Sequence, residues 1–277
     1  GTCVPYRLDS VGRGRIMTVP VHIGGNVRDF VFDTGAAQFN FVSERFAREN
    51  GIRMIADSIP VAGIGRGWVG LGVADSLAVG GIVMRNPVFL ISPPDQATDT
   101  IEVISAVLGN AFMRKAERFT IDNRTRHIVF PAERTLHADG TKRMANMMLN
   151  SFQPYVRIHA DGIPLLFHFD TGNVATTLYP PYYELFREQV DSCGVEDTVR
   201  IGGFAGVAEN VCYRLPSVEF TLEGVPFTLR DIDVLPSGSA GATAGSEAGS
   251  LGTDFATAFD TLTVDYTSCT VLGENVP

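Results

Sequence analysis

The 277-residue sequence has no uninterrupted apolar run of the roughly 18 residues that a membrane-spanning helix needs. It contains only four cysteines, none in a Cys-x-x-Cys pair, and its five histidines form no cluster, so no metal site is expected. Basic residues are also scarce, because 22 Lys and Arg face 31 Asp and Glu, which gives a net charge of −9. A surface this acidic suits a phosphate backbone poorly, so nucleic acid is not an expected partner.

The residues that are present indicate a globular, all-β protein. Apolar residues make up 45% of the chain, and 29 glycines with 15 prolines point to many turns. Few stretches show helical periodicity, whereas valine, threonine and phenylalanine, which favour strands, are frequent. The length fits one or two domains at about 150 residues each.

The chain contains one unit twice. The tripeptide Asp33-Thr34-Gly35 recurs as Asp170-Thr171-Gly172, and each copy follows a predicted β-hairpin whose turn contains glycine. In both copies the strand before the Asp carries two phenylalanines spaced by two residues, which places both rings on one face. An apolar-Gly step then follows at Gly109 and at Gly252. This repeat predicts a lobe over 1–136, a linker over 137–150 and a second lobe over 151–277.

Other landmarks recur in register. Asp122 and Asp265 each lie thirteen residues after the glycine of the apolar-Gly step, and we expect them to hold turns rather than to act in catalysis. His22 and His159 also match, and we expect them on outward strand faces.

Each half also predicts a short helix and a glycine-rich hairpin. Ser43 can cap a helix that ends near Gly51, and Pro180-Pro181 can open another that runs toward Val190. The first hairpin centres on residues 63–67 and the second on residues 202–206.

Two aspartates on tight, facing loops can share one proton. One carboxylate then takes a proton from water while the other donates a hydrogen bond to a carbonyl oxygen, which makes water a competent nucleophile for an amide. Like charges this close cannot both ionise easily, so the pair retains its proton. Asp33 and Asp170 are the candidates; Gly35 and Gly172 would allow close approach, and Thr34 and Thr171 can hydrogen-bond to the opposite loop.

The sequence resembles the aspartic proteases, and the retropepsin-like branch in a single-chain form of bacterial type more than the pepsin-like branch. The resemblance rests on residues 32–36 and 169–173 with the two apolar-Gly steps, and it covers nearly the whole chain. It implies a bilobal acid-protease fold of two retropepsin-like β-barrel lobes about a pseudo-twofold axis, with catalytic Asp33 and Asp170 and no cofactor or metal. It also implies flap and rim residues that contact the substrate: Gly63, Ile64, Gly65, Trp68, Gly203 and Phe204.

The expected function is an aspartic endopeptidase that acts as a monomer on a peptide or protein substrate. The alternative is a catalytically weak or inactive peptidase-like module that binds peptides or cell-surface polymers, because Asn173 departs from the family pattern. The segment from Ser237 to Ser250 is a candidate substrate rim, and Trp68 fits a substrate wall and ordinary packing equally. We expect export to the periplasm or cell surface; the start at Gly1 indicates a processed or trimmed chain, and any export signal would have been removed before it.

The cysteines and the pH dependence give two further expectations. Cys193 and Cys212 flank the second hairpin and could form a disulfide across its base, with two separate thiols as the alternative. Cys3 and Cys269 are the other possible pair, since the termini run side by side in the resembled fold. Ala36 offers no side-chain donor to the carboxyl pair whereas Asn173 offers an amide, and we expect a bell-shaped activity profile with an optimum of roughly pH 4–6.5.

Overall fold

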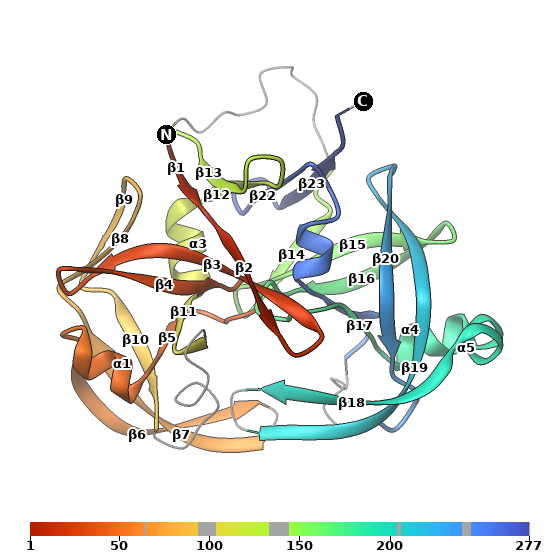
Figure 1. Ribbon diagram of the computed structural model, residues 1–277, viewed down its shortest axis with the longest axis horizontal. Coiled ribbons are helices and arrows are strands. Elements are labelled where there is room, and N and C mark those ends of the chain that lie inside the picture. Colours follow the sequence, from red (N-terminus) through yellow and green to blue (C-terminus); the bar gives the residue numbers. More distant parts are fainter. Residues whose placement is uncertain (64, 94–103, 133–143, 204–205, 240–244, 277) are drawn as a thin grey trace.

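The computed structural model describes residues 1–63, 65–93, 104–132, 144–203, 206–239 and 245–276. These residues form three β-sheets with short helices at their ends (Figure 1). The mostly β structure confirms the predicted fold class. Among the described residues, no helix is long and apolar enough to cross a membrane.

The first sheet has ten strands, all from the first part of the chain. Their order is β6-β7-β10-β5-β11-β4-β3-β8-β9, with β2 paired to β3. The strands are β2 (Arg7–Val11), β3 (Gly14–Ile23), β4 (Asn26–Phe32), β5 (Asn40–Ser43), β6 (Arg53–Gly63), β7 (Gly65–Val73), β8 (Ser76–Val79), β9 (Ile82–Arg85), β10 (Val88–Ser92) and β11 (Ala106–Leu108). Gly24 and Gly25 join β3 to β4 with φ of 57° and 78°, a left-handed turn that glycine adopts without strain.

The second sheet has eight strands from the later part of the chain, in the order β14-β15-β16-β21-β17-β20-β19-β18. The strands are β14 (Met147–Asn150), β15 (Gln153–Ala160), β16 (Ile163–Phe169), β17 (Thr177–Leu178), β18 (Val195–Gly203), β19 (Gly206–Leu222), β20 (Val225–Val234) and β21 (Gly249–Leu251). The predicted linker over 137–150 therefore reaches too far, because its last four residues form β14 and pair with β15. Residues 137–143 lie outside the described residues.

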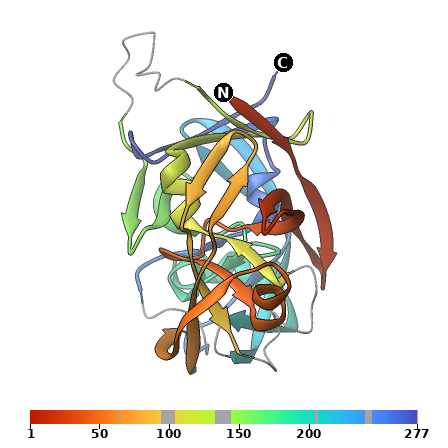
Figure 2. The same ribbon diagram turned by 90° about the vertical axis from the view of Figure 1, so that its left-hand side faces the viewer.

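A third, bridging sheet combines strands from both halves of the chain (Figures 1 and 2). Its order is β1-β13-β12-β22-β23, and it consists of β1 (Thr2–Pro5), β12 (Arg118–Asp122), β13 (His127–Phe130), β22 (Thr261–Asp265) and β23 (Thr270–Glu274). The central pairing is antiparallel, with Phe119 opposite Val264. Backbone hydrogen bonds thus tie the two halves together on one side of the molecule.

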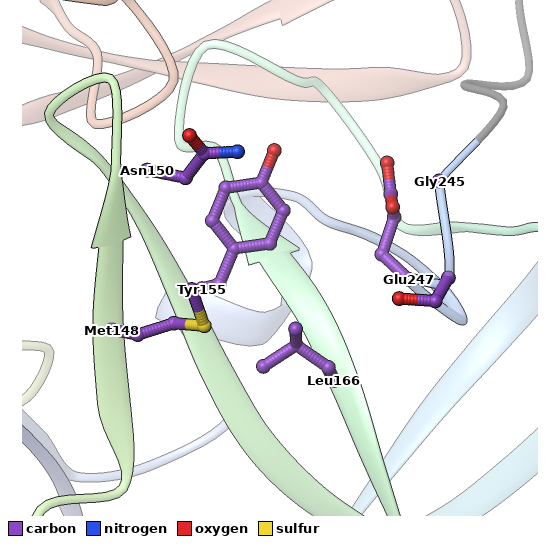
Figure 3. A pocket seen from close by; sticks show the side chains of 7 residues that line it. Met148, Asn150, Tyr155, Leu166, Gly245 and Glu247 are labelled. Carbon is purple, nitrogen blue, oxygen red and sulfur yellow. The ribbon is translucent and has the colours of Figure 1, made fainter.

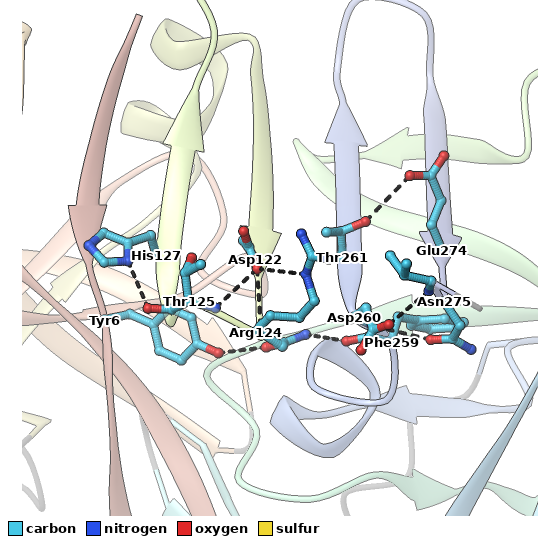
Figure 4. Close-up of polar contacts among 12 residues, drawn as sticks. Tyr6, Asp122, Arg124, Thr125, His127, Phe259, Asp260, Thr261, Glu274 and Asn275 are labelled. Carbon is cyan, nitrogen blue, oxygen red and sulfur yellow. Dashed lines mark hydrogen bonds and ion pairs between the residues drawn. The ribbon is translucent and has the colours of Figure 1, made fainter.

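Asp122 and Asp265 hold the turns at the ends of β12 and β22. Oδ1 of Asp122 accepts hydrogen bonds from the backbone N–H groups of Arg124 and Thr125, at 3.0 and 3.2 Å (Figure 4). Asp265 accepts two equivalent bonds, from Thr267 and Ser268, at 2.8 and 3.0 Å. Such side-chain-to-backbone bonds stabilise turns, which agrees with the structural role expected for both residues.

Phenylalanines fill the core beneath each Asp-Thr-Gly loop. Phe32 packs edge-on against Phe119 with ring centroids 5.0 Å apart, and Phe169 packs in the same way against Phe255 at 5.3 Å. Such edge-to-face pairs add about 0.5–1.5 kcal/mol to the burial of their area. The strands that lead into the two aspartates are therefore fixed by fully buried rings.

The helices are short: α1 (Glu44–Glu49), α3 (Asn110–Ala116), α4 (Pro180–Leu185), α5 (Arg187–Cys193) and α6 (Thr253–Ala256). Ser43 caps α1 as predicted, because its Oγ accepts a hydrogen bond from the backbone N–H of Phe46 at 3.1 Å. The single helix predicted from Pro180 toward Val190 is instead two helices. Phe186, with φ −118° and ψ 26°, ends α4 and precedes α5.

All four cysteines are free thiols, so neither expected disulfide is present. The register of the β18–β19 hairpin places Cys212 opposite Asp197, while Cys193 lies before this hairpin at the end of α5. Cys3 lies on β1 and Cys269 beside β23, at opposite edges of the bridging sheet. Four strand spacings separate these edges, roughly 19 Å, whereas a disulfide needs Cα atoms within about 7 Å.

Candidate active site

The two Asp-Thr-Gly loops begin where β4 and β16 end. In each case a short parallel strand lies beside the loop: β11 pairs Leu108 with Phe32, and β21 pairs Leu251 with Phe169. These neighbours also hold the aspartate backbones, because Asp33 N–H donates to the Leu108 carbonyl at 3.1 Å and Asp170 N–H to that of Leu251 at 2.9 Å. The apolar-Gly step of each half is therefore the strand that fixes the position of the aspartate.

Thr34 and Thr171 lock the two loops together. Each backbone N–H donates to the hydroxyl of the other threonine, at 3.0 Å from Thr34 and 3.1 Å from Thr171. Each hydroxyl in turn donates across to the opposite strand, Thr34 to the carbonyl of Phe169 at 2.8 Å and Thr171 to that of Phe32. Both threonines are fully buried, so this reciprocal network is sheltered from water.

Gly35 and Gly172 let each loop approach the opposite carboxyl group. A Cβ on Gly35 would lie 2.1 Å from Cγ of Asp170, and one on Gly172 would lie 2.4 Å from Oδ2 of Asp33. Real side chains do not tolerate such distances, so glycine is required at both positions for steric reasons. The structure thus places Asp33 and Asp170 together, as the sequence predicts.

Hydrogen bonds orient both carboxyl groups. Oδ1 of Asp33 accepts from the backbone N–H groups of Gly35 and Ala36, both at 2.8 Å, and Oδ1 of Asp170 accepts from Gly172 at 2.9 Å. The charge of Asp170 also raises the pKa of Asp33, so the two carboxyl groups act directly on each other. Two acids that interact in this way retain a proton between them, which fits a pair with a single negative charge.

The surroundings favour the protonated form of Asp33. Although both aspartates are partly exposed, their carboxyl groups lie against the opposite loops. Loss of water contact, followed by the charge of Asp170, raises the pKa of Asp33 well above its ordinary value. Loss of water contact also raises the pKa of Asp170, but the hydrogen bond from Asp33 and several backbone N–H groups oppose this rise. Asp170 is therefore the better candidate for the ionised member.

A layer of residues that sequence reasoning missed supports the loops. Asn110 donates from Nδ2 to the carbonyls of Thr34 and Ala36, both at 2.7 Å, and its Oδ1 accepts from the hydroxyl of Tyr266 at 2.8 Å. In the second half Thr253 donates from Oγ1 to the carbonyl of Thr171 at 3.1 Å. Asn110 and Thr253 each follow the glycine of the apolar-Gly step, and this shared position is the signal that could have revealed them.

The side chain of Asn173 does not act on the carboxyl pair in the way the sequence suggested. Its Nδ2 is directed to Oγ of Ser250 at 3.4 Å. The backbone N–H of Asn173 donates to the main-chain carbonyl of Asp170 at 3.0 Å. The Asn173 amide is therefore directed away from the carboxyl pair.

The predicted flap residues lie on two hairpins, β6–β7 and β18–β19, on the side of the molecule opposite the bridging sheet (Figure 1). Gly63 pairs with Gly65, and Gly203 pairs with Gly206, at the two hairpin ends. Ile64 and Phe204 lie outside the described residues. The side chain of Trp68 on β7 is 62% exposed, which excludes ordinary core packing for it. Residues 240–244 of the predicted rim are not described, whereas Gly249 and Ser250 belong to β21.

Comparisons with known proteins agree with this geometry. The family model described as aspartyl protease matches residues 19–112, which include Asp33 and Gly109. No curated protein matches the sequence. Among solved structures, the basic 7S globulin from soybean has a similar fold, with a TM-score of 0.56 and 10% identity over 98% of this chain and 93% of that chain. These findings support the aspartic protease family, and the structural likeness extends the fold to the whole chain.

Proposed function

We propose that this chain is a single-chain, retropepsin-like aspartic endopeptidase. Asp170, as the ionised member, would take a proton from a water molecule while this water attacks the peptide carbonyl. Asp33, as the protonated member, would donate its hydrogen bond to the carbonyl oxygen as negative charge develops there. The proton then passes to the leaving amine, and the pair regains its single charge.

The observation that carries this proposal is the close approach of each aspartate carboxyl group to the glycine of the opposite Asp-Thr-Gly loop. Holding two acids together in a rigid setting costs free energy of folding. Strongly shifted pKa values of this kind are concentrated at functional sites. The buried threonine network supplies the rigidity, since it fixes both loops without touching the reactive oxygens.

We further propose that the substrate binds as an extended peptide between the site and the hairpins β6–β7 and β18–β19. Edge strands and hairpins offer backbone groups that pair with an extended chain, and the exposed Trp68 would add an apolar contact. Because both aspartates belong to one chain, a monomer would be sufficient.

Digestion of a peptide library with mass-spectrometric readout tests the proposal. We expect cleavage by the native chain, inhibition by the transition-state mimic pepstatin, and no cleavage by Asp33→Asn or Asp170→Asn. Asp161→Asn is the matched control, because Asp161 is an exposed hairpin-turn residue with φ 49°, a conformation that asparagine also adopts.

Two results would contradict the proposal. Full turnover in either active-site variant would exclude a mechanism that needs both acids. Binding of peptides by the native chain without any cleavage would instead identify the non-catalytic binding module. The likeness to the soybean globulin shows the fold alone and does not decide between these functions.

A further inference from the structure

A cavity of about 410 Å³ is lined by residues of the second half of the chain (Figure 3). Its lining comes from β14, β15, β16 and the segment that leads into β21. The lining residues are Met148, Asn150, Tyr155, Leu166, Gly245, Ser246 and Glu247. Cavities of this size lie within the range that small ligands and side chains occupy.

The strand register places this cavity next to the carboxyl pair. Tyr155 on β15 lies opposite His168 on β16, with ring centroids 5.1 Å apart, and His168 precedes Asp170 by two residues. Gln153 shares the strand face of Tyr155 and donates from Nε2 to the carbonyl of Gly35. The face of the β15–β16 hairpin that lines the cavity therefore also reaches the active-site loops.

The cavity combines apolar walls with one charged group. Met148 and Leu166 provide aliphatic surface, and Tyr155 presents its ring at the centre of the group, across from Glu247 (Figure 3). Glu247 is only 8% exposed, whereas Met148 is 50% exposed at the cavity opening. Among the seven described lining residues, Glu247 is the one with an acidic side chain.

The Glu247 carboxylate rests directly against Gly245. A Cβ on Gly245 would lie 1.8 Å from Oε2 of Glu247, so a side chain at position 245 would require the carboxylate to shift.

Two basic residues, Arg157 and His168, lie on the same face of the β15–β16 hairpin as Tyr155. Arg157, the next cation on this face of β15, is bonded to Glu223 at 3.0 Å. His168 has a buried Nε2 without a hydrogen-bond partner among the described residues. Burial lowers the pKa of His168, although the charges of Asp33 and Glu247 oppose the change, so the ring favours its neutral form.

We infer that this cavity is a specificity pocket for a lysine or arginine side chain of the peptide substrate, with Glu247 as its charge partner. This inference rests on the proposed function. The aliphatic stem of the substrate side chain lies along Met148 and Leu166, and its cationic group meets the Tyr155 ring and the Glu247 carboxylate. An uncharged substrate side chain of the same length would make only the apolar contacts with Met148 and Leu166.

Binding of uncleavable peptides tests the pocket independently of catalysis. Fluorescent peptides with a hydroxyethylene group in place of the scissile bond would carry lysine or norleucine at each position in turn. At one position we expect lysine to bind the native chain at least about tenfold more tightly, which corresponds to about 1.4 kcal/mol. Glu247→Gln should remove this preference, and Glu247→Lys should reverse it in favour of glutamate.

A control variant separates local from general charge effects. Glu188→Gln neutralises an exposed carboxylate in the first turn of α5, and it should leave the lysine preference unchanged. Gly245→Ala should reduce the preference, because the new methyl group displaces the Glu247 carboxylate. Equilibrium unfolding in urea would verify that each variant is folded.

The outcomes distinguish this inference from the proposed function. Equal affinity for lysine and norleucine at every position, failure to bind any of the peptides, or a lysine preference that survives in folded Glu247→Gln would overturn the pocket. Selective binding by a chain that cleaves no peptide would uphold the pocket and refute the peptidase. Cleavage of peptides by a chain that shows no lysine preference in binding would uphold the peptidase and refute the pocket.

Discussion

Replacing Thr171 by valine should severely destabilise the fold. Valine has nearly the shape of threonine but no hydroxyl group, so it removes two hydrogen bonds while it preserves the packing. The backbone N–H of Thr34 and the carbonyl of Phe32 both lose their partner in a site from which water is excluded.

The expected magnitude follows from these two groups. A buried polar group left without a partner costs about 1–3 kcal/mol, so the pair costs about 2–6 kcal/mol. Native proteins have free energies of unfolding of about 5–15 kcal/mol, so this loss would be a large fraction of the total. Thr171→Ser keeps the oxygen and loses one methyl group, which costs about 1 kcal/mol of burial.

Equilibrium unfolding in urea of Thr171→Val, Thr171→Ser and the native chain gives the comparison. Thr120→Val is the matched control, since its hydroxyl bonds to that of Thr263 at 2.8 Å in the half-exposed bridging sheet and should contribute little. The role assigned to the threonine network would be refuted if Thr171→Val were no less stable than Thr171→Ser.

Four further predictions concern the carboxyl pair and the thiols. The folded-state pKa of Asp33 is raised, so the stability that Asp33 contributes is complete below its unfolded pKa and is lost as pH rises through its folded pKa. The free energy of unfolding in urea should therefore fall less between acidic and neutral pH in Asp33→Asn than in the native chain. An equal fall in both would contradict the raised pKa. Gly172→Ala should abolish peptide cleavage, whereas Gly81→Ala, whose Cβ would lie 3.6 Å from its nearest neighbour, should not; cleavage assays of both check the steric argument. Asn173→Ala should leave the pH profile of cleavage unchanged, because the Asn173 amide is directed to Ser250 rather than to the carboxyl pair; a shifted acidic limb would restore a role for the amide. Mass spectrometry after alkylation without reductant should count four free thiols, with Cys193 modified before Cys212, because burial raises the pKa of Cys212 to about 12.

Local sequence patterns were sufficient to predict the parts of the site that depend on short-range geometry. The glycine turns at residues 24–25 and 161–162, the paired phenylalanines and the Asp-Thr-Gly tripeptides all follow from conformational preferences within a few residues. Their repetition supplied the long-range information, since it predicted that Asp33 and Asp170 occupy equivalent places. The contact between them confirms that expectation.

The errors arose where register or distant contacts decide the outcome. Cys212 lies opposite Asp197 because the β18–β19 hairpin turns at residues 203–206 rather than at the midpoint of Cys193 and Cys212. The support of Asn110 by Tyr266 joins residues 156 positions apart, and no local pattern encodes such a contact. The break at Phe186 is equally invisible to helix signals, which describe the caps at either end rather than an interruption between them.

The inequality of the two aspartates shows how a repeated motif can give each copy a different role. Asp33 accepts hydrogen bonds from two backbone N–H groups, those of Gly35 and Ala36. At Asp170 the carboxyl group accepts a hydrogen bond from the backbone N–H of Gly172. Burial raises the pKa of both acids, but the charge of Asp170 adds to the rise at Asp33, whereas the interaction with Asp33 opposes the rise at Asp170. The assignment of base and acid in the proposed reaction therefore follows from how each carboxyl group acts on the other, which the identical Asp-Thr-Gly letters do not reveal.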